Sequence, residues 1–274
     1  MIHPLEYEEL VRMALREDAP FGDPFGESLK GEAAGNFIAG GVGVFCGGPV
    51  AVEVFRQVDP SVSAAFVEEG KRLQPGERVG EARGPAGSLL RGERVALNFL
   101  QKLSGVATCT ARYVERAAAY GTRILDTRKT TPLFRALEKY AVRTGGGANH
   151  RFSLSDGILI KENGIRAAGG IAEAVEAARR AVPHLARVEV EVETLEDAET
   201  AIAAGADAIL LDNMPPEKVG EAVRRFGGSV FLEASGGIRL ENVELYARTG
   251  VDAVSIGALT HSAPALDISF ELLP

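Results

Sequence analysis

The sequence predicts an α/β protein in which a TIM-like, incomplete α/β barrel follows a smaller N-terminal α+β domain. From about residue 105 onward, short β-branched runs alternate with alanine-rich stretches of helical pattern, which is the order of parallel βα units. Polar residues follow the ends of these runs, as they do at the mouth of a barrel. Before residue 105, helical and strand patterns are mixed and do not repeat. We therefore expect one domain at residues 1–104 and the barrel at residues 105–263.

The barrel region carries patterns for six strands and several helices. The expected strands are at 123–126, 158–161, 188–192, 208–212, 230–233 and 253–256, and helices are expected at 171–180, 195–204 and 216–226. Six strands are fewer than the eight of a full TIM barrel, so a doubly wound open sheet is the alternative. Because polar residues end many different strands, the pattern favours a barrel that is incomplete or open on one side.

The N-terminal region begins with an amphipathic stretch at residues 5–15 and continues with a glycine-flanked apolar run at 40–48, expected to be a strand. A helical pattern follows at 50–58, and Pro75 and Gly76 mark a turn. The glycines of the apolar run lack the spacing of a dinucleotide-binding or P-loop motif. This region is therefore expected to be structural.

Composition excludes several classes of protein. Hydrophobic residues make up 46% of the chain and charged residues 25%, and no stretch approaches the roughly 18 apolar residues that span a bilayer. The first ten residues carry acid where a signal peptide carries base, so a cytoplasmic location is expected. A net charge of −8 argues against nucleic-acid binding. Cys46 and Cys109 lack the spacing of a zinc or redox site.

Cationic side chains gather after the first two barrel strands. Arg128 and Lys129 lie beyond the first strand, where a planar donor fork and a point charge could grip a carboxylate or phosphate. A glycine-rich turn precedes His150 and Arg151 and would allow an anion to approach closely. Lys161 ends the second strand and could bind an anion, form a salt bridge or form a Schiff base. Solvated loops are the alternative interpretation.

Acidic side chains mark the middle strands. The alternation in residues 187–193 directs Glu189, Glu191 and Glu193 to one side of a strand, and Asp212 ends the next strand. In a barrel that side can point inward, where carboxylates suit Mg²⁺, a hard cation that prefers oxygen ligands and often bridges substrate phosphates. An edge strand with one wet face is the alternative.

Small, glycine-containing turns follow the last two strands. Ser235, Gly236 and Gly237 form the first turn, and Ser255, Ile256 and Gly257 form the second. Each offers backbone N–H groups at the start of the next element, and loops after the last two strands often hold phosphate in barrels. Tight turns without a ligand are the alternative.

Together these residues resemble the quinolinate phosphoribosyltransferase family. The resemblance is distributed over the barrel region and extends weakly to the opening of the chain at residues 15–18 and 22–23. The segments that carry it occur in order at 93–108, 126–132, 138–143, 145–151, 159–161, 188–193, 210–213, 233–238 and 260–262.

The resemblance implies an enzyme of NAD biosynthesis, a carboxylating nicotinate-nucleotide diphosphorylase. Such an enzyme transfers phosphoribosyl from phosphoribosyl pyrophosphate to quinolinate with Mg²⁺, giving nicotinate mononucleotide, pyrophosphate and carbon dioxide. Both substrates are polyanions, which would explain a cationic pocket in an acidic protein.

Carried over by position, the resemblance implies that Arg128, His150 and Arg151 bind the quinolinate carboxylates, beside Thr127, and that Arg94 arrives from the neighbouring subunit of a homodimer. It implies four catalytic residues: Lys129 and Lys161 near the reacting centre, and the acidic pair Glu191 and Asp212 near the ribose and Mg²⁺. The turns at 235–237 and 255–257 match the 5′-phosphate site, and the tail 264–274 is expected to return to the first domain.

Four positions depart from the family pattern. Glu162 and Gly164 stand where the family usually has aspartate and histidine after the strand lysine. Leu133 stands where it usually has glycine after Thr-Thr-Pro, and Ser153 replaces another usual glycine. None of the four removes a predicted ligand.

Three other functions compete with this interpretation. One is the molybdenum-associated branch of the same superfamily, against which Lys161 and the His150–Arg151 pair argue. Another is a Schiff-base lyase on a similar barrel, using Lys129 or Lys161. The third is a non-catalytic protein that binds a metabolite.

Overall fold

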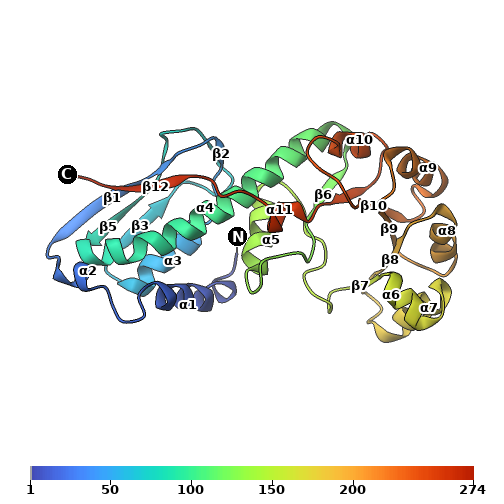
Figure 1. The fold of residues 1–274 in the computed structure, drawn as a ribbon, viewed down its shortest axis with the longest axis horizontal. Coiled ribbons are helices and arrows are strands. Elements are labelled where there is room, and N and C mark those ends of the chain that lie inside the picture. The colour runs from blue at the N-terminus through green and yellow to red at the C-terminus, as the bar shows by residue number, and fades with distance from the viewer. Residues whose placement is uncertain (1) are drawn as a thin grey trace. The chain divides into compact units, whose positions relative to one another are not determined.

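The computed structural model of the protein describes residues 2–274, which form two compact units (Figure 1). The first unit comprises residues 2–111 together with Thr130–Gly146 and Ala258–Pro274, and the second comprises Arg112–Lys129 and Gly147–Gly257. Helix α4 (Ala86–Ala117) is continuous through residue 104, where the sequence analysis placed a domain boundary.

A four-stranded antiparallel sheet forms the first unit, in the order β12–β1–β5–β3. Its strands are β1 (Glu32–Ala39), β3 (Ser63–Phe66), β5 (Arg78–Pro85) and β12 (Ile268–Leu272). The C-terminal strand β12 pairs with β1, and Phe37 lies opposite Phe270. Phe37 is fully buried, and its ring centroid lies 4.6 Å from that of Phe270 and 5.0 Å from that of Phe66. Aromatic packing thus holds the C-terminal strand in this sheet.

Helices and two short strands complete the first unit. They are η1 (Pro4–Glu6), α1 (Glu8–Asp18), α2 (Pro24–Ser28), β2 (Gly43–Val44), α3 (Gly48–Val58), β4 (Arg72–Leu73), α5 (Arg135–Thr144) and α11 (Ala258–His261). The predicted helix at 50–58 is confirmed. The strand predicted at 40–48 is much shorter than expected, because Gly47 adopts a φ of 112° and caps α3.

Six parallel strands form the sheet of the second unit, in the order β6–β11–β10–β9–β8–β7. They are β6 (Arg123–Leu125), β7 (Ile158–Ile160), β8 (Val188–Val192), β9 (Ala208–Asp212), β10 (Phe231–Ser235) and β11 (Ala253–Ser255). All six predicted strands are confirmed. Within residues 2–274, β6 and β7 do not pair, so the parallel sheet stays open between them, as expected for an incomplete barrel.

The helices that follow these strands lie on the outer side of the sheet (Figure 1). They are α6 (Glu162–Ala168), α7 (Ile171–Ala181), α8 (Leu195–Ala203), α9 (Pro216–Phe226) and α10 (Val243–Ala247), with the short η2 (Ala118–Tyr120) before β6. The predicted helices at 171–180, 195–204 and 216–226 are confirmed. In the described chain, no helix combines the length and apolar character required to cross a membrane.

The strand register decides which side chains share a level of the barrel. Val190, Ile209 and Leu232 are buried and alternate with the residues of the inner face. At the last level of the sheet, Ser235 lies opposite Asp212 on one neighbouring strand and opposite Ser255 on the other. Functional candidates from three strands therefore meet at one edge, at their carboxyl ends.

Candidate active site

A cavity of about 600 Å³ lies at the carboxyl ends of the strands of the second unit. Most of the predicted site residues line it: Thr127, Arg128, Lys129, His150, Arg151, Lys161, Glu191, Asp212, Ser235, Gly236, Gly237 and Ser255. Leu159, Leu210, Asn213 and Glu233 also line it, and the sequence analysis gave them no role. The structure thus gathers residues that are up to 128 positions apart into one site.

Asp126, immediately after β6, organises the turn that carries the next cations. Its side chain is fully buried, and one carboxylate oxygen accepts a hydrogen bond from the backbone N–H of His150 at 2.9 Å. The other carboxylate oxygen accepts one from the side-chain amide of Asn149. Because this buried carboxylate holds two neighbouring residues of the turn, it fixes the entry of His150 into the cavity. Sequence analysis placed Asp126 in a motif but missed this role.

Both ring nitrogens of His150 are engaged within the second unit. Nδ1 accepts the backbone N–H of Arg151 at 2.7 Å, so in the neutral ring the proton is on Nε2. Nε2 lies 3.1 Å from Oε2 of Glu189 and 3.6 Å from Oε1 of Glu233. In this geometry His150 supports the main chain of Arg151 and contacts two acidic side chains.

Glu233 lines the cavity and Glu189 contacts His150, and only 1% and 8% of their respective surfaces are exposed. Burial, and then the negative charge of Glu189, raises the pKa of Glu233 to about 7, against opposing effects of His150 and a hydrogen bond from Ser255. Among the described residues, Oε1 of Glu233 has no hydrogen-bond partner. A metal ion in this cluster would need the lone pair of Nε2, the nitrogen that carries the proton while Nδ1 accepts from Arg151.

Two guanidinium groups of like charge lie near each other at the cationic side of the cavity. Burial, and then the positive charge of Arg128, lowers the pKa of Arg151. Nη1 of Arg151 donates to the backbone oxygen of Gly157 at 2.9 Å, which holds the side chain in place. A ligand with two negative charges would relieve the repulsion between these two groups.

Lys161 forms an ion pair with Glu191. The lysine side chain is half exposed, whereas that of Glu191 is largely buried. Lys161 thus forms a salt bridge, one of the alternatives that the sequence left open for it. A Schiff base on Lys161 would first require the amine to leave its ion pair with Glu191.

The turn after β10 has a backbone that requires glycine. Gly236 has a φ of 93°, and a Cβ atom there would lie 2.2 Å from Oδ1 of Asn213. Asn213 itself has a φ of 52°, donates its N–H to the oxygen of Ser235 at 2.8 Å, and holds Asp212 through its side-chain amide at 2.8 Å. Close packing of the two turns thus sets the positions of Ser235 and Asp212.

Three predicted site residues are absent from the cavity lining. Ile256 is buried, and its N–H donates to the oxygen of Leu125 at 2.9 Å, so this N–H is not available to a phosphate. Gly257 is half-buried. Arg94 belongs to the first unit, where it is exposed on α4. Of the second predicted phosphate turn, only Ser255 lines the cavity.

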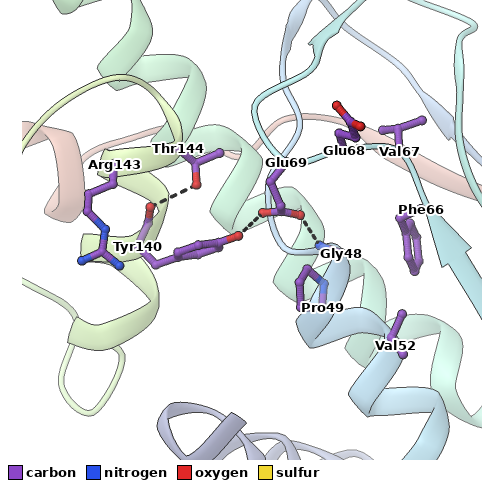
Figure 2. A pocket seen from close by; sticks show the side chains of 10 residues that line it. All are labelled: Gly48, Pro49, Val52, Phe66, Val67, Glu68, Glu69, Tyr140, Arg143 and Thr144. Atoms are coloured by element: carbon purple, nitrogen blue, oxygen red, sulfur yellow. Dashed lines mark hydrogen bonds between the residues drawn. The ribbon is translucent and has the colours of Figure 1, made fainter. Parts of the chain in front are cut away.

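A cavity of about 620 Å³ in the first unit has a different polar lining (Figure 2). Glu69 accepts hydrogen bonds from the backbone N–H groups of Gly47 and Gly48, at the amino end of α3, and from the hydroxyl of Tyr140 at 2.7 Å. Burial and the charge of Glu69 raise the pKa of Tyr140, and both also raise the pKa of Cys46. The carboxylate of Glu69 already occupies the helix terminus that could bind an anion.

Comparison with known proteins gives a consistent result over nearly the whole chain. The family model "Quinolinate phosphoribosyl transferase, N-terminal domain" matches residues 27–104, and the corresponding C-terminal domain model matches residues 106–271. The chain is 45% identical to a "Probable nicotinate-nucleotide pyrophosphorylase [carboxylating]" of Bacillus subtilis, over 98% of this chain and 94% of that protein. It is 42% identical to the human "Nicotinate-nucleotide pyrophosphorylase [carboxylating]", over 99% of this chain and 93% of the human protein.

Solved structures agree with these relatives. The nicotinate-nucleotide pyrophosphorylase of Francisella tularensis has a TM-score of 0.96 and 40% identity, covering 100% of this chain and 98% of that one. The crystal structure of NadC from Streptococcus pyogenes has a TM-score of 0.95 and 42% identity, covering 100% of this chain and 99% of that one.

Proposed function

This chain belongs to the quinolinate phosphoribosyltransferase family, and we propose that it transfers phosphoribosyl from phosphoribosyl pyrophosphate to the ring nitrogen of quinolinate. The products are nicotinate mononucleotide, pyrophosphate and carbon dioxide, and the reaction belongs to NAD biosynthesis. The activity is that of a carboxylating nicotinate-nucleotide pyrophosphorylase. One observation carries the proposal, namely that a single cavity combines adjacent guanidinium groups, inward-facing carboxylates and a glycine turn.

The cationic side of the cavity suits the dicarboxylate. Quinolinate carries two neighbouring carboxylates, and the planar donor forks of Arg128 and Arg151 match carboxylate geometry. Binding would replace the repulsion between two guanidinium groups with charge-assisted hydrogen bonds. Lys129, exposed at the end of the same loop, would add a further positive charge near the ring. These groups orient the ring nitrogen for attack on the ribose.

The acidic side of the cavity suits the phosphoribosyl donor. As the bond from the ribose to pyrophosphate breaks and the bond to the ring nitrogen forms, positive charge develops on the sugar. Glu191 and Asp212 face this part of the cavity and would stabilise that charge. Lys161, paired with Glu191, would meet the anionic substrates at the reacting centre. The 5′-phosphate would bind the turn Ser235–Gly237.

We further propose Mg²⁺ as the metal, bound mainly through the substrate and water. Glu191 and Asp212 are oxygen donors that line the same cavity, and their chemistry fits a hard cation. Because Glu191 already pairs with Lys161, Asp212 is the side chain better placed to contribute an oxygen. When bound, Mg²⁺ would neutralise charge on the pyrophosphate.

We also propose a homodimer in which Arg94 of one subunit completes the dicarboxylate site of the other. The exposure of Arg94 on α4 and its absence from the cavity lining of its own chain support this arrangement. The cytoplasm is the compartment that we expect for the enzyme.

The test incubates the purified protein with quinolinate, phosphoribosyl pyrophosphate and Mg²⁺, and measures nicotinate mononucleotide and carbon dioxide in equal amounts. Nicotinate replaces quinolinate in a parallel reaction, as a control for an acceptor that has lost one carboxylate. Treatment with borohydride during turnover checks for a covalent adduct on Lys129 or Lys161. Absence of product from quinolinate, whether or not nicotinate reacts, or a trapped adduct, would contradict the proposal.

A further inference from the structure

We propose that Glu189 and Glu233 are positioning residues for the dicarboxylate site, and that they act on Arg151 through His150. The inference rests on the proposed function, because it assigns these residues to the part of the cavity that would bind quinolinate. Neither glutamate contacts the substrate in this arrangement. Their role is to hold the imidazole that supports the arginine.

A continuous set of contacts runs from β8 to Arg151. Oε2 of Glu189 lies 3.1 Å from Nε2 of His150, and Oε1 of Glu233 lies 3.6 Å from the same nitrogen. The opposite ring nitrogen, Nδ1, accepts the N–H of Arg151 at 2.7 Å. When Nε2 carries the proton and faces the glutamates, Nδ1 keeps a lone pair that can accept the N–H of Arg151. The glutamates can therefore fix the orientation of the ring, and the ring can fix the main chain of Arg151.

The carboxyl groups of Glu189 and Glu233 are buried, which costs free energy. Glu189 and Glu233 are 8% and 1% exposed, and within residues 2–274 Oε1 of Glu233 finds no hydrogen-bond partner. Burying carboxylates that lie near each other is unfavourable unless a positive or donor group compensates, and apolar side chains would fill the same space without that cost. Nε2 of His150 contacts Glu189 and lies 3.6 Å from Glu233, so this imidazole is the group that gives acidic side chains a function at these positions.

The charge of Glu189 connects this cluster to the guanidinium groups. The negative charge of Glu189 favours the charged form of Arg151 and opposes the effects of burial and of Arg128, which lower its pKa. The side chain of Arg151 is anchored separately, by its hydrogen bond to Gly157 at 2.9 Å. The main chain depends on His150. Loss of the two glutamates would therefore leave the main chain of Arg151 less firmly held. It would also remove negative charge that offsets the repulsion between Arg128 and Arg151.

The location of the cluster agrees with a supporting role. His150, Arg151 and Glu233 line both the main cavity and a second cavity of about 420 Å³, which is also lined by Arg123 and Phe231 at the starts of β6 and β10. The cluster thus lies between the carboxyl-end cavity and the amino-end side of the sheet. It forms the floor of the proposed dicarboxylate site.

The experiment compares Glu189→Leu, Glu189→Gln and Glu233→Gln with the wild-type enzyme. Leucine removes the acceptor for Nε2, whereas glutamine keeps an acceptor oxygen in nearly the same volume. Glu199→Gln is the matched control, because Glu199 is an exposed glutamate of the same unit with an ion-pair partner, Arg225 at 2.9 Å. Folding of each variant is verified by thermal unfolding and circular dichroism.

Two readouts separate positioning from a general structural effect. The first is the KM for quinolinate against the KM for phosphoribosyl pyrophosphate. The second is the ¹⁵N spectrum of histidine-labelled protein, which is simple because the chain has 4 histidines. The signal of His150 is assigned by its disappearance in His150→Asn.

In Glu189→Leu, we expect the quinolinate KM to rise about tenfold or more, with the KM for phosphoribosyl pyrophosphate within roughly twofold, and the Nε2-protonated signal of His150 to be lost. In Glu189→Gln, the quinolinate KM and the His150 signal should both be close to those of the wild type. In Glu233→Gln, both should change less than in Glu189→Leu. An unchanged His150 signal in Glu189→Leu, or an equal rise in both KM values, would overturn the inference. If the wild-type enzyme does not form nicotinate mononucleotide, the proposed function fails, and the ¹⁵N readout still decides whether Glu189 positions His150.

Discussion

The two units of this protein each contain a cavity of similar volume, about 620 Å³ in the first and about 600 Å³ in the second, but their polar groups differ. In the first cavity, Glu69 accepts hydrogen bonds from the backbone N–H of Gly47 and, as Figure 2 shows, from that of Gly48 and from the hydroxyl of Tyr140. In the second, Arg128 and Arg151 carry like charges, and Oε1 of Glu233 is buried and has no hydrogen-bond partner in the described chain. Volume does not distinguish the two. The electrostatics do, because an anionic ligand would offset the repulsion between the like charges of Arg128 and Arg151.

The largest expected effect comes from removing one charge of the second cavity. Arg151→Ala should lower kcat/KM for quinolinate by roughly a hundredfold to a thousandfold, because a charge-assisted contact to a carboxylate is lost in a desolvated site. Steady-state kinetics with each substrate varied in turn measures the change. Arg151→Lys should recover only part of the activity, since an ammonium lacks the planar fork. An Arg151→Ala enzyme with wild-type kinetics would remove this cavity as the active site.

A second prediction asks whether the first unit contributes to catalysis through Arg94 rather than through its own cavity. Arg94→Ala and Lys161→Ala should each be nearly inactive alone. When the two variants are mixed and allowed to exchange subunits, roughly a quarter of the wild-type activity should return, because half of the dimers are mixed and each has one intact site. Activity is measured before and after exchange, with Arg94→Ala exchanged against itself as the control. No recovery in demonstrably mixed dimers would contradict a shared site.

A third prediction uses the buried carboxyl group of Glu233 in the second cavity. The pKa of Glu233 is raised to about 7 in the folded protein, so the folded state binds a proton that the unfolded state releases near its ordinary value of 4.5. The contribution of Glu233 to the free energy of unfolding should therefore be greatest below about pH 4.5. It should fall by up to about 3 kcal/mol as the pH rises toward 7. Urea unfolding at several pH values measures the slope.

Glu233→Gln is the control for this pH dependence, because an amide does not titrate. In Glu233→Gln, the fall in the free energy of unfolding that Glu233 causes between about pH 4.5 and 7 should disappear, whereas Glu199→Gln should keep it. Identical pH profiles in wild type and Glu233→Gln would contradict the raised pKa.

A fourth prediction concerns the glycine turn of the second cavity. Gly236→Ala should lower the free energy of unfolding by about 2 kcal/mol, because the residue has a φ of 93° and its Cβ would meet Asn213. It should also raise the KM for phosphoribosyl pyrophosphate. Gly228→Ala is the matched control, since Gly228 has a φ of 80° with open space around a Cβ. Equal stability losses would show that backbone strain alone, and not the contact with Asn213, restricts the turn.

The smallest effect is expected in the first cavity. Tyr140→Phe removes one of the hydrogen bonds to Glu69 and should lower the free energy of unfolding by about 1 kcal/mol, with kcat/KM unchanged. Thermal unfolding and steady-state kinetics on the same preparation provide both values. A large loss of activity without a change in stability would show that the first cavity serves catalysis, and would reverse the comparison.

The sequence by itself determined the family, the six parallel strands and most of the cavity lining. These features depend on local patterns, such as the alternation around Glu191 and the polar residues that end each strand, for example Lys161 and Asp212. A period of two assigns a side chain to a face of the sheet, and the end of a strand assigns it to the mouth of the barrel. Both can be read without knowing which strands are neighbours.

Only the tertiary structure decided how these residues are paired. Glu189 and Glu191 share one face of β8, yet one is buried beside His150 and the other pairs with Lys161 at the mouth. The role of Glu233 and the loss of the Ile256 N–H to Leu125 depend on neighbouring strands that are distant in sequence. The physical reason is that depth and partner are set by strand register, which arises from non-local hydrogen bonding and leaves no period in the sequence.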